Sequence, residues 1–250
     1  MSQARQVVIG DVHGHYDGLM RLMEAIAPVS DDEVYFLGDL IDRGEKSAQV
    51  LDFVQASGYV CLLGNHEQML LEAFPDGQVS TQALQTWLYS GGQATVSSYD
   101  KPERLLEKLD WIQTFPTHLD LGSIWLVHAG LHPGLSLESQ SCHEFCWIRE
   151  AFHSSTQPYF QHKLIITGHT ITFTLPNVEP GKLARGKGWM DIDTGAYHPK
   201  SGWLTAFDTT NDIVHQVHVF SNVSRTSDLE EVVVDIDPSQ IRSRRQFSML

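Results

Sequence analysis

Five short apolar runs in this chain each end beside a glycine and an acidic, amide or imidazole side chain. They read QVVIG at 6–10, VYFLG at 34–38, VCLLG at 60–64, SIWLVHAG at 123–130 and KLIITGH at 163–169. Helix-like stretches at 16–26 and 47–56 separate the first three runs. Apolar strands that alternate with helices indicate βαβ units and a largely parallel sheet that is covered on both faces. The runs therefore predict an α/β fold.

The polar residues at these strand ends are Asp11 and His13; Asp39, Asp42 and Arg43; Asn65 and His66; His128; and His169. Parallel strands carry their carboxyl ends to one edge of a sheet, so we expect these side chains to converge on one crevice. Mixed nitrogen and oxygen ligands of this kind suit Mn, Fe, Zn or Ni, and do not suit calcium or a thiolate site.

Two ions can be assigned from these residues. The first would be held by Asp11, His13 and Asp39, and Asp39 would bridge to a second ion held by Asn65, His128 and His169. A two-ion site of this type suits in-line displacement at phosphorus. Glu67, although it follows directly, is better placed to begin the next helix than to bind metal.

Composition limits the partners of the chain. The formal charge of −14, from 17 basic and 31 acidic residues, disfavours nucleic acid and anionic lipid surfaces. Three cysteines make no disulfide framework, and no apolar run approaches the roughly 18 residues of a membrane span. The opening MSQARQVVIGD has too short an apolar run for a signal peptide. We therefore predict a cytoplasmic protein with no nucleic-acid or membrane partner.

The rest of the chain divides into three parts. Residues 67–117 are rich in helix patterns, and the last third holds the strand-like runs WMDIDTG, GWLTAFD and IVHQVHVF, which predict a second, antiparallel or mixed sheet. From about Ser221 the pattern weakens, and the chain ends in the basic, polar IRSRRQFSML. We predict one domain over 1–220 and a C-terminal extension, partly disordered, over 221–250.

The motifs GDVHG, GDLIDRG and GNHE, followed by HAG and GHT, resemble the signature of the metallophosphoesterases. More narrowly they resemble the bacterial PPP-type serine/threonine protein phosphatases, over about residues 7–208. The resemblance implies a calcineurin-like β-sandwich flanked by helices, with two divalent ions at the sheet edge and Mn as the first choice. A hydroxide that bridges the metals would attack phosphorus directly, without a covalent phosphoenzyme.

The resemblance also implies roles for individual residues. His66 would donate a proton to the leaving oxygen, and Asp42 would hold its imidazole in the protonated form. Arg43, together with Arg149 of CWIRE, would bind the phosphate, because a planar guanidinium grips two oxygens at once. Asn65 would contact substrate as well as metal.

Three functions are open at this point. The resemblance favours a phosphatase for phosphoserine and phosphothreonine proteins, with phosphotyrosine as a further substrate. The alternative is symmetrical hydrolysis of dinucleoside tetraphosphates: His13 favours the phosphatases, since the best-known bacterial tetraphosphatases commonly have Gln there, whereas HAGLHP resembles the tetraphosphatases. The third is an inactive module that binds phosphorylated partners, which the intact ligand set argues against. The sequence indicates no regulatory subunit.

Overall fold

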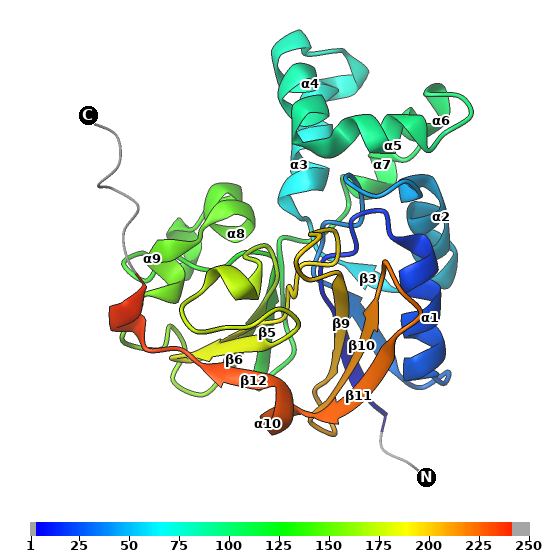
Figure 1. Cartoon of the computed structure of the whole chain (residues 1–250). Helices are drawn as coiled ribbons and strands as arrows, with labels where there is room; N and C mark the ends of the chain where they lie inside the picture. The colour runs from blue at the N-terminus through cyan, green and yellow to red at the C-terminus, as the bar shows by residue number, and fades with distance from the viewer. Residues whose placement is uncertain (1–3, 242–250) are drawn as a thin grey trace, which may run out of the picture.

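The computed structural model of the chain describes residues 4–241, which form two six-stranded sheets flanked by helices (Figure 1). The first sheet has the order β11-β10-β9-β1-β2-β3. Its strands are β1 (Gln6–Ile9), β2 (Glu33–Phe36), β3 (Val60–Cys61), β9 (Trp203–Asp208), β10 (Ile213–His218) and β11 (Ser224–Asp228). The predicted α/β class and the two flanked sheets are confirmed.

The N-terminal βαβ units appear as predicted. Strands β1, β2 and β3 are parallel, and helices α1 (Tyr16–Ile26) and α2 (Ser47–Ser57) connect them on one face of the sheet. Leu19, Leu22 and Ile26 of α1 are buried there. Full burial of an aliphatic side chain contributes about 1.5–3 kcal/mol, so this helix face is a large part of what fixes α1 to the sheet.

The second sheet has the order β12-β7-β8-β6-β5-β4. Its strands are β4 (His118–Asp120), β5 (Ile124–Val127), β6 (Leu164–Thr167), β7 (Leu183–Gly186), β8 (Trp189–Asp191) and β12 (Val233–Asp235). Strands β5, β6 and β8 are parallel to one another. Helices α8 (Cys142–Trp147) and α9 (Glu150–His153) lie on the outer side of this sheet.

The two sheets pack against each other through one buried apolar cluster. From the first sheet the cluster includes Val8 of β1, Leu37 after β2 and Leu62 after β3. These side chains pack with Leu126 and Ile166 of the second sheet. The alternate residues of β1 face the helices instead. Both faces of these strands are therefore covered, which is why their sequences are apolar throughout rather than alternating.

The sequence predicted a second sheet formed by the strands of the last third. In the structure these strands do not form a separate sheet. β8 joins the second sheet beside β6, whereas β9 pairs antiparallel with β1 in the first sheet and β10 pairs with the other side of β9. The pairing of Val7 with Asp208 and of Val8 with Phe207 sets this register. Five of the six residues of β9 are buried, so a central position in the first sheet satisfies the burial that this run needs.

The helix-rich segment at 67–117 is confirmed. Its helices are α3 (Asn65–Ala73), α4 (Thr81–Trp87), α5 (Gln93–Ser97), α6 (Glu103–Leu106) and α7 (Leu109–Ile112), and a π-helical turn at Leu88–Gly92 links α4 to α5. We call residues 74–117 the cap, because Figure 1 shows this segment standing above one end of the sheets. Gly92 packs on the Trp87 ring so closely that a Cβ there would lie 2.4 Å from it.

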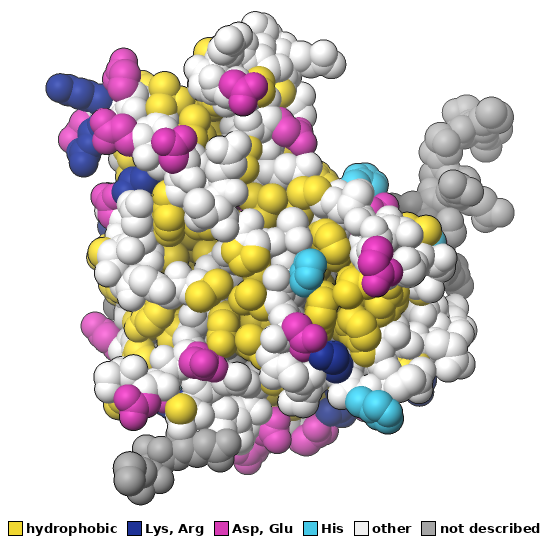
Figure 2. All heavy atoms as spheres, turned by 180° about the vertical axis from the view of Figure 1, so that it is seen from behind, with side chains coloured by type: hydrophobic (Ala, Val, Ile, Leu, Met, Phe, Trp, Pro, Cys, Tyr) yellow, Lys and Arg dark blue, Asp and Glu magenta, His cyan; other side chains and the backbone are white. Residues whose placement is uncertain are grey.

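The segment after residue 220 adds strands to both sheets. β11 lies at the edge of the first, and α10 (Leu229–Val232) leads to β12 at the edge of the second. The division at residue 220 stays a prediction, and most of the basic end, residues 242–250, lies outside the described residues. Among residues 4–241, no helix has the length and apolar character needed to cross a membrane. On the face in Figure 2, acidic side chains are scattered and the basic ones form no stripe.

Candidate metal centre

The predicted ligands converge where strands of both sheets end. Asp11 and His13 follow β1, Asp39 follows β2, Asn65 begins α3 after β3, and His128 and His169 follow β5 and β6 of the second sheet. All six side chains are buried. The expected convergence on one edge is therefore observed, although the edge is built from two sheets rather than one.

Backbone strain is concentrated at this edge. Nine non-glycine residues in the described chain have positive φ, and five belong to the predicted site: His13, Asp39, Asp42, Arg43 and His169. Such conformations cost free energy unless the surroundings hold them, and they gather where a protein positions functional groups. The short loops after β1, β2 and β6 therefore hold these side chains in fixed directions.

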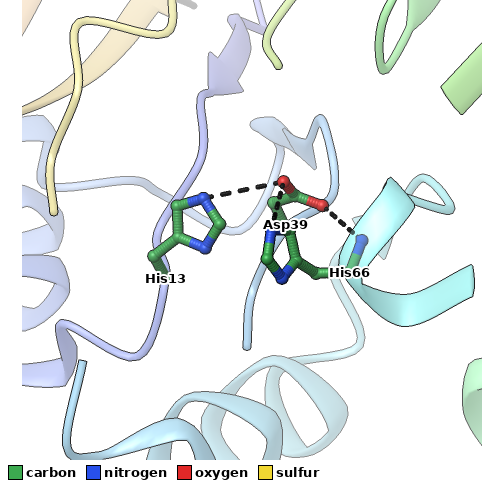
Figure 3. Close-up of side chains that lie close together, drawn as sticks. All are labelled: His13, Asp39 and His66. Carbon is green, nitrogen blue, oxygen red and sulfur yellow. Dashed lines mark hydrogen bonds and ion pairs between the residues drawn. The ribbon is translucent and has the colours of Figure 1, made fainter. Parts of the chain in front are cut away.

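One cluster is formed by His13, Asp39 and His66 (Figure 3). His13 Nε2 lies 3.6 Å from Asp39 Oδ2, and His66 Nε2 lies 4.0 Å from the same oxygen. Asp11, which the sequence placed in this ligand set, lies beside it, with Oδ2 4.0 Å from His13 Nε2. The Asp11 carboxylate also accepts a hydrogen bond from the backbone N–H of His169.

The other cluster joins Asp39 to His128, His169 and Asn65. Asn65 Oδ1 lies 2.7 Å from His169 Nδ1 and 3.0 Å from His128 Nε2. Asp39 Oδ1 lies 3.4 Å from His128 Nε2. Asp39 therefore contributes one carboxylate oxygen to each cluster, which is the arrangement expected of a bridging ligand.

The chemistry of these groups fits bound cations. His13 Nδ1 donates to the carbonyl of Ile41 and His128 Nδ1 to that of Leu37, since a carbonyl can only accept. Burial, and then the neighbouring His66, lowers the pKa of His13 to about 3. Burial also lowers the pKa of His128. Both rings are then neutral, and each turns an Nε2 lone pair towards carboxylate oxygens, an arrangement that a cation between them would satisfy.

The His169 imidazole and the Asp11 carboxyl would also be stabilised by a bound cation. His169 Nε2 is buried and has no hydrogen-bond partner. Burial, followed by the nearby charges of Asp193 and Asp39, raises the pKa of Asp11 well above its usual range. Crowded acids and unpaired imidazole nitrogens are costly inside a protein unless a charge of opposite sign joins them. The donor set therefore fits divalent cations of the transition series.

His66 also makes the contact that the sequence predicted with Asp42. His66 Nδ1 lies 2.5 Å from Asp42 Oδ2. Burial alone lowers the pKa of His66, but the carboxylates of Asp39 and Asp42 outweigh it, so the net shift is upward. An imidazole that keeps its proton more tightly is suited to donate it to a leaving group.

Two residues of the cap hydrogen-bond to Asp42, and no sequence signal revealed them. Trp87 Nε1 donates to Asp42 Oδ2 at 3.0 Å, and the Thr95 hydroxyl donates to Asp42 Oδ1 at 2.6 Å. Asp42, Trp87 and Thr95 are all fully buried. The cap therefore fixes the acid that orients His66.

We expect Trp87→Phe to lower the free energy of unfolding by about 1.5–3 kcal/mol beyond the loss of ring volume, because the hydrogen bond to a charged acceptor is removed. Urea denaturation measures the change. Trp189→Phe is the matched control, since Trp189 is equally buried and its Nε1 has no partner. Equal losses in the two variants would show that the bond to Asp42 contributes little.

The two predicted phosphate ligands lie beside the candidate metal ligands. Arg43 and Arg149 line a cavity of about 150 Å³ together with His13, Asn65 and His66. The Arg43 guanidinium lies over the Tyr197 ring, 4.6 Å from its centroid. Arg149 Nη1 donates to the carbonyl of His169 at 3.0 Å. The Arg43 guanidinium is thus held by stacking and that of Arg149 by a hydrogen bond at Nη1, and both residues are exposed, which leaves donors free for an anion.

Three more residues support the site. Glu67, the third residue of α3, accepts hydrogen bonds from the backbone N–H groups of Asp39, Leu40 and Gly64. Its predicted place at a helix start is confirmed, but its larger effect is to hold the loop after β2. Asp193 and Tyr197 line the cavity and were missed, although WMDIDTG repeats the pattern of a strand followed by an acid.

Residues 4–189 match the family model described as "Calcineurin-like phosphoesterase". The chain is 37% identical over 142 residues to a symmetrical bis(5'-nucleosyl)-tetraphosphatase of Actinobacillus succinogenes, which covers 54% of this chain and 47% of that protein. For the enzyme of the same name from Dechloromonas aromatica the identity is 36%, over 50% of this chain and 43% of that one. The chain thus spans about half the length of these relatives.

Solved structures show the same fold. The cold-active protein-tyrosine phosphatase of a Shewanella species superposes with a TM-score of 0.58 at 19% identity, over 90% of this chain and 80% of that one. At this identity the likeness speaks for the fold alone. The family match covers far more than half of the 250 residues and includes the loops after β1, β2, β3, β5 and β6. The chain belongs to the calcineurin-like phosphoesterases, a family of metal-dependent phosphoester hydrolases.

Proposed function

We propose that this chain hydrolyses phosphoanhydrides with two divalent ions, and that its substrate is a dinucleoside tetraphosphate cleaved symmetrically. The observation that carries the chemistry is the Asp39 carboxylate, shared between two imidazole clusters beside His66 and two arginines. The substrate rests on the relatives, which are named as symmetrical tetraphosphatases. The sequence favoured a protein phosphatase, and its alternative now has the better support.

In this proposal Asp11, His13 and Asp39 hold one ion, and Asp39, Asn65, His128 and His169 hold the other. When bound, two such ions supply Lewis acidity for phosphoryl oxygens and a water nucleophile at neutral pH. Manganese is the first ion to test.

The remaining residues act on the substrate. Arg43 and Arg149 flank the cavity and would neutralise charge on the oxygens of the phosphoryl group in transfer. Asn65, which also lines the cavity, would contact one of these oxygens. His66 would give its proton to the departing oxygen, and Asp42 keeps the ring turned for that transfer.

The purified chain is expected to turn over diadenosine tetraphosphate with Mn²⁺ at a higher kcat/KM than a phosphoserine peptide, and to yield two molecules of ADP. Chromatography of the nucleotides separates this outcome from asymmetric cleavage to AMP and ATP. Protein treated with EDTA is the control. Preference for the peptide would restore the protein-phosphatase reading, and silence on both substrates with two ions bound would support the inactive binding module.

A further inference from the structure

A second cavity, of about 520 Å³, lies next to the cavity of the metal centre. Arg43 and Tyr197 line both cavities, so these two side chains form the boundary between them. The outer cavity is also lined by Tyr16 at the start of α1 and by Val219 and Phe220 after β10. We call it the Phe220 pocket. Its volume is in the range of roughly 300–1,000 Å³ that is usual for small-molecule sites.

The walls of the Phe220 pocket are aromatic and accessible. Phe220 is 55% exposed, and it is the only phenylalanine among the large apolar side chains that residues 4–241 leave exposed. The His15 ring meets it edge-on, with centroids 5.5 Å apart. Tyr16 and Tyr197 add two further rings to the lining. Such rings suit a flat π-system, because every nucleobase can stack on an aromatic side chain.

The charges in the pocket are arranged unevenly. Lys46 and Asp17 both line it and pair with each other at 2.6 Å, and Glu45 lies on the rim beside them. Arg43 has no carboxylate partner among the ion pairs of residues 4–241 and lies at the boundary with the metal centre. The positive charge without a carboxylate partner therefore lies at the boundary with the metal centre, and the Phe220 side offers stacking surface.

We propose that the Phe220 pocket binds the nucleobase of one half of the dinucleoside tetraphosphate, while Arg43 contacts the phosphate chain that leads from it to the metals. This inference rests on the proposed function and adds a location for specificity. A third cavity of about 440 Å³ shares Tyr197 and lies on the Arg149 side, but its apolar lining comes from Ile171, Leu175 and Ile241, which are aliphatic. The aromatic lining is what assigns the base to the Phe220 side.

The test compares a substrate that carries nucleobases with one that has none. In Phe220→Ala, the ratio of kcat/KM for diadenosine tetraphosphate to that for p-nitrophenyl phosphate is expected to fall roughly 5- to 150-fold, as stacking of about 1–3 kcal/mol is lost. Phe220→Trp keeps a ring and should retain the ratio. Val223→Ala is the control, because Val223 is 51% exposed three residues away and does not line the pocket.

The outcomes separate this inference from the proposed function. If wild-type protein cleaves diadenosine tetraphosphate and Phe220→Ala leaves the ratio unchanged, the pocket assignment is wrong and the function stands. A fall in the ratio with Leu175→Ala, and none with Phe220→Ala, would move the base to the Arg149 side. If wild-type protein cleaves p-nitrophenyl phosphate alone, both proposals fail. Urea denaturation of each variant checks that a change in the ratio does not come from unfolding.

Discussion

His66→Asn is expected to lower kcat on phenyl phosphate by about 10²- to 10⁴-fold, the usual contribution of a general acid. The loss on p-nitrophenyl phosphate should be smaller, because that leaving group is a weak base and needs little help from a proton. The same holds for diadenosine tetraphosphate, whose leaving group in symmetrical cleavage is ADP, a nucleoside diphosphate. The reason lies in the 2.5 Å contact between His66 Nδ1 and Asp42, which directs Nε2 to the cavity.

The measurement is kcat across a series of substituted phenyl phosphates at one pH and saturating Mn²⁺. A loss that grows with the basicity of the leaving group identifies His66 as the acid. Losses of one size across the series would instead mean that the ring acts in binding or in holding Asp39, which lies 4.0 Å from its Nε2. Metal content must be determined in parallel, so that a lost ion is not taken for a lost proton donor.

Asp39→Asn should remove metal from both positions, since Asp39 contacts both clusters. Changing a residue that merely orients a ligand costs 10- to 100-fold in affinity, so the loss here should exceed about 100-fold. Asparagine adopts positive φ as readily as aspartate does, so the backbone at φ 51° can stay as it is. The variant therefore isolates the charge.

Elemental analysis after dialysis against a fixed concentration of Mn²⁺ gives the ions bound per chain. The matched control is Asp212→Asn, because Asp212 has a similar φ of 55° but is exposed and far from the strand ends that form the centre. We expect about two ions per chain in the control and fewer than one in Asp39→Asn. If the variant retained a single ion at full affinity, the assignment of Asp39 as the shared ligand would be wrong.

The convergence of the candidate ligands could be predicted because each of them follows a strand. Whether a residue follows a strand can be read from the local sequence. Because parallel strands end at one edge of a sheet, residues that follow them lie close together in space. Asp193 follows the same rule after β8 and could have been found in the same way. The roles of the ligands rest on proposals that the two substitutions above test.

Other parts of the site depend on contacts that no local pattern encodes. Trp87 reaches Asp42 across 45 residues, through a cap whose helices are short and whose π-helical turn has no clear sequence signal. The partner of β9 was missed for a similar reason, because an apolar run reports that a strand is buried and not which neighbour buries it. Tyr197 lies in a turn between β8 and β9, where its ring direction is set by His13 and Arg43.

The origin of the ligands in two sheets has a consequence for folding. Asp11 and His169 are 158 residues apart and follow strands of different sheets, so their meeting requires both sheets to be folded and docked. The unfolded chain cannot present this arrangement, and ions that prefer it bind the native state selectively. By mass action, each tenfold rise in free ion above its Kd then adds about 1.4 kcal/mol of stability per site. Metal supply would thus govern how long the protein persists as well as how fast it works.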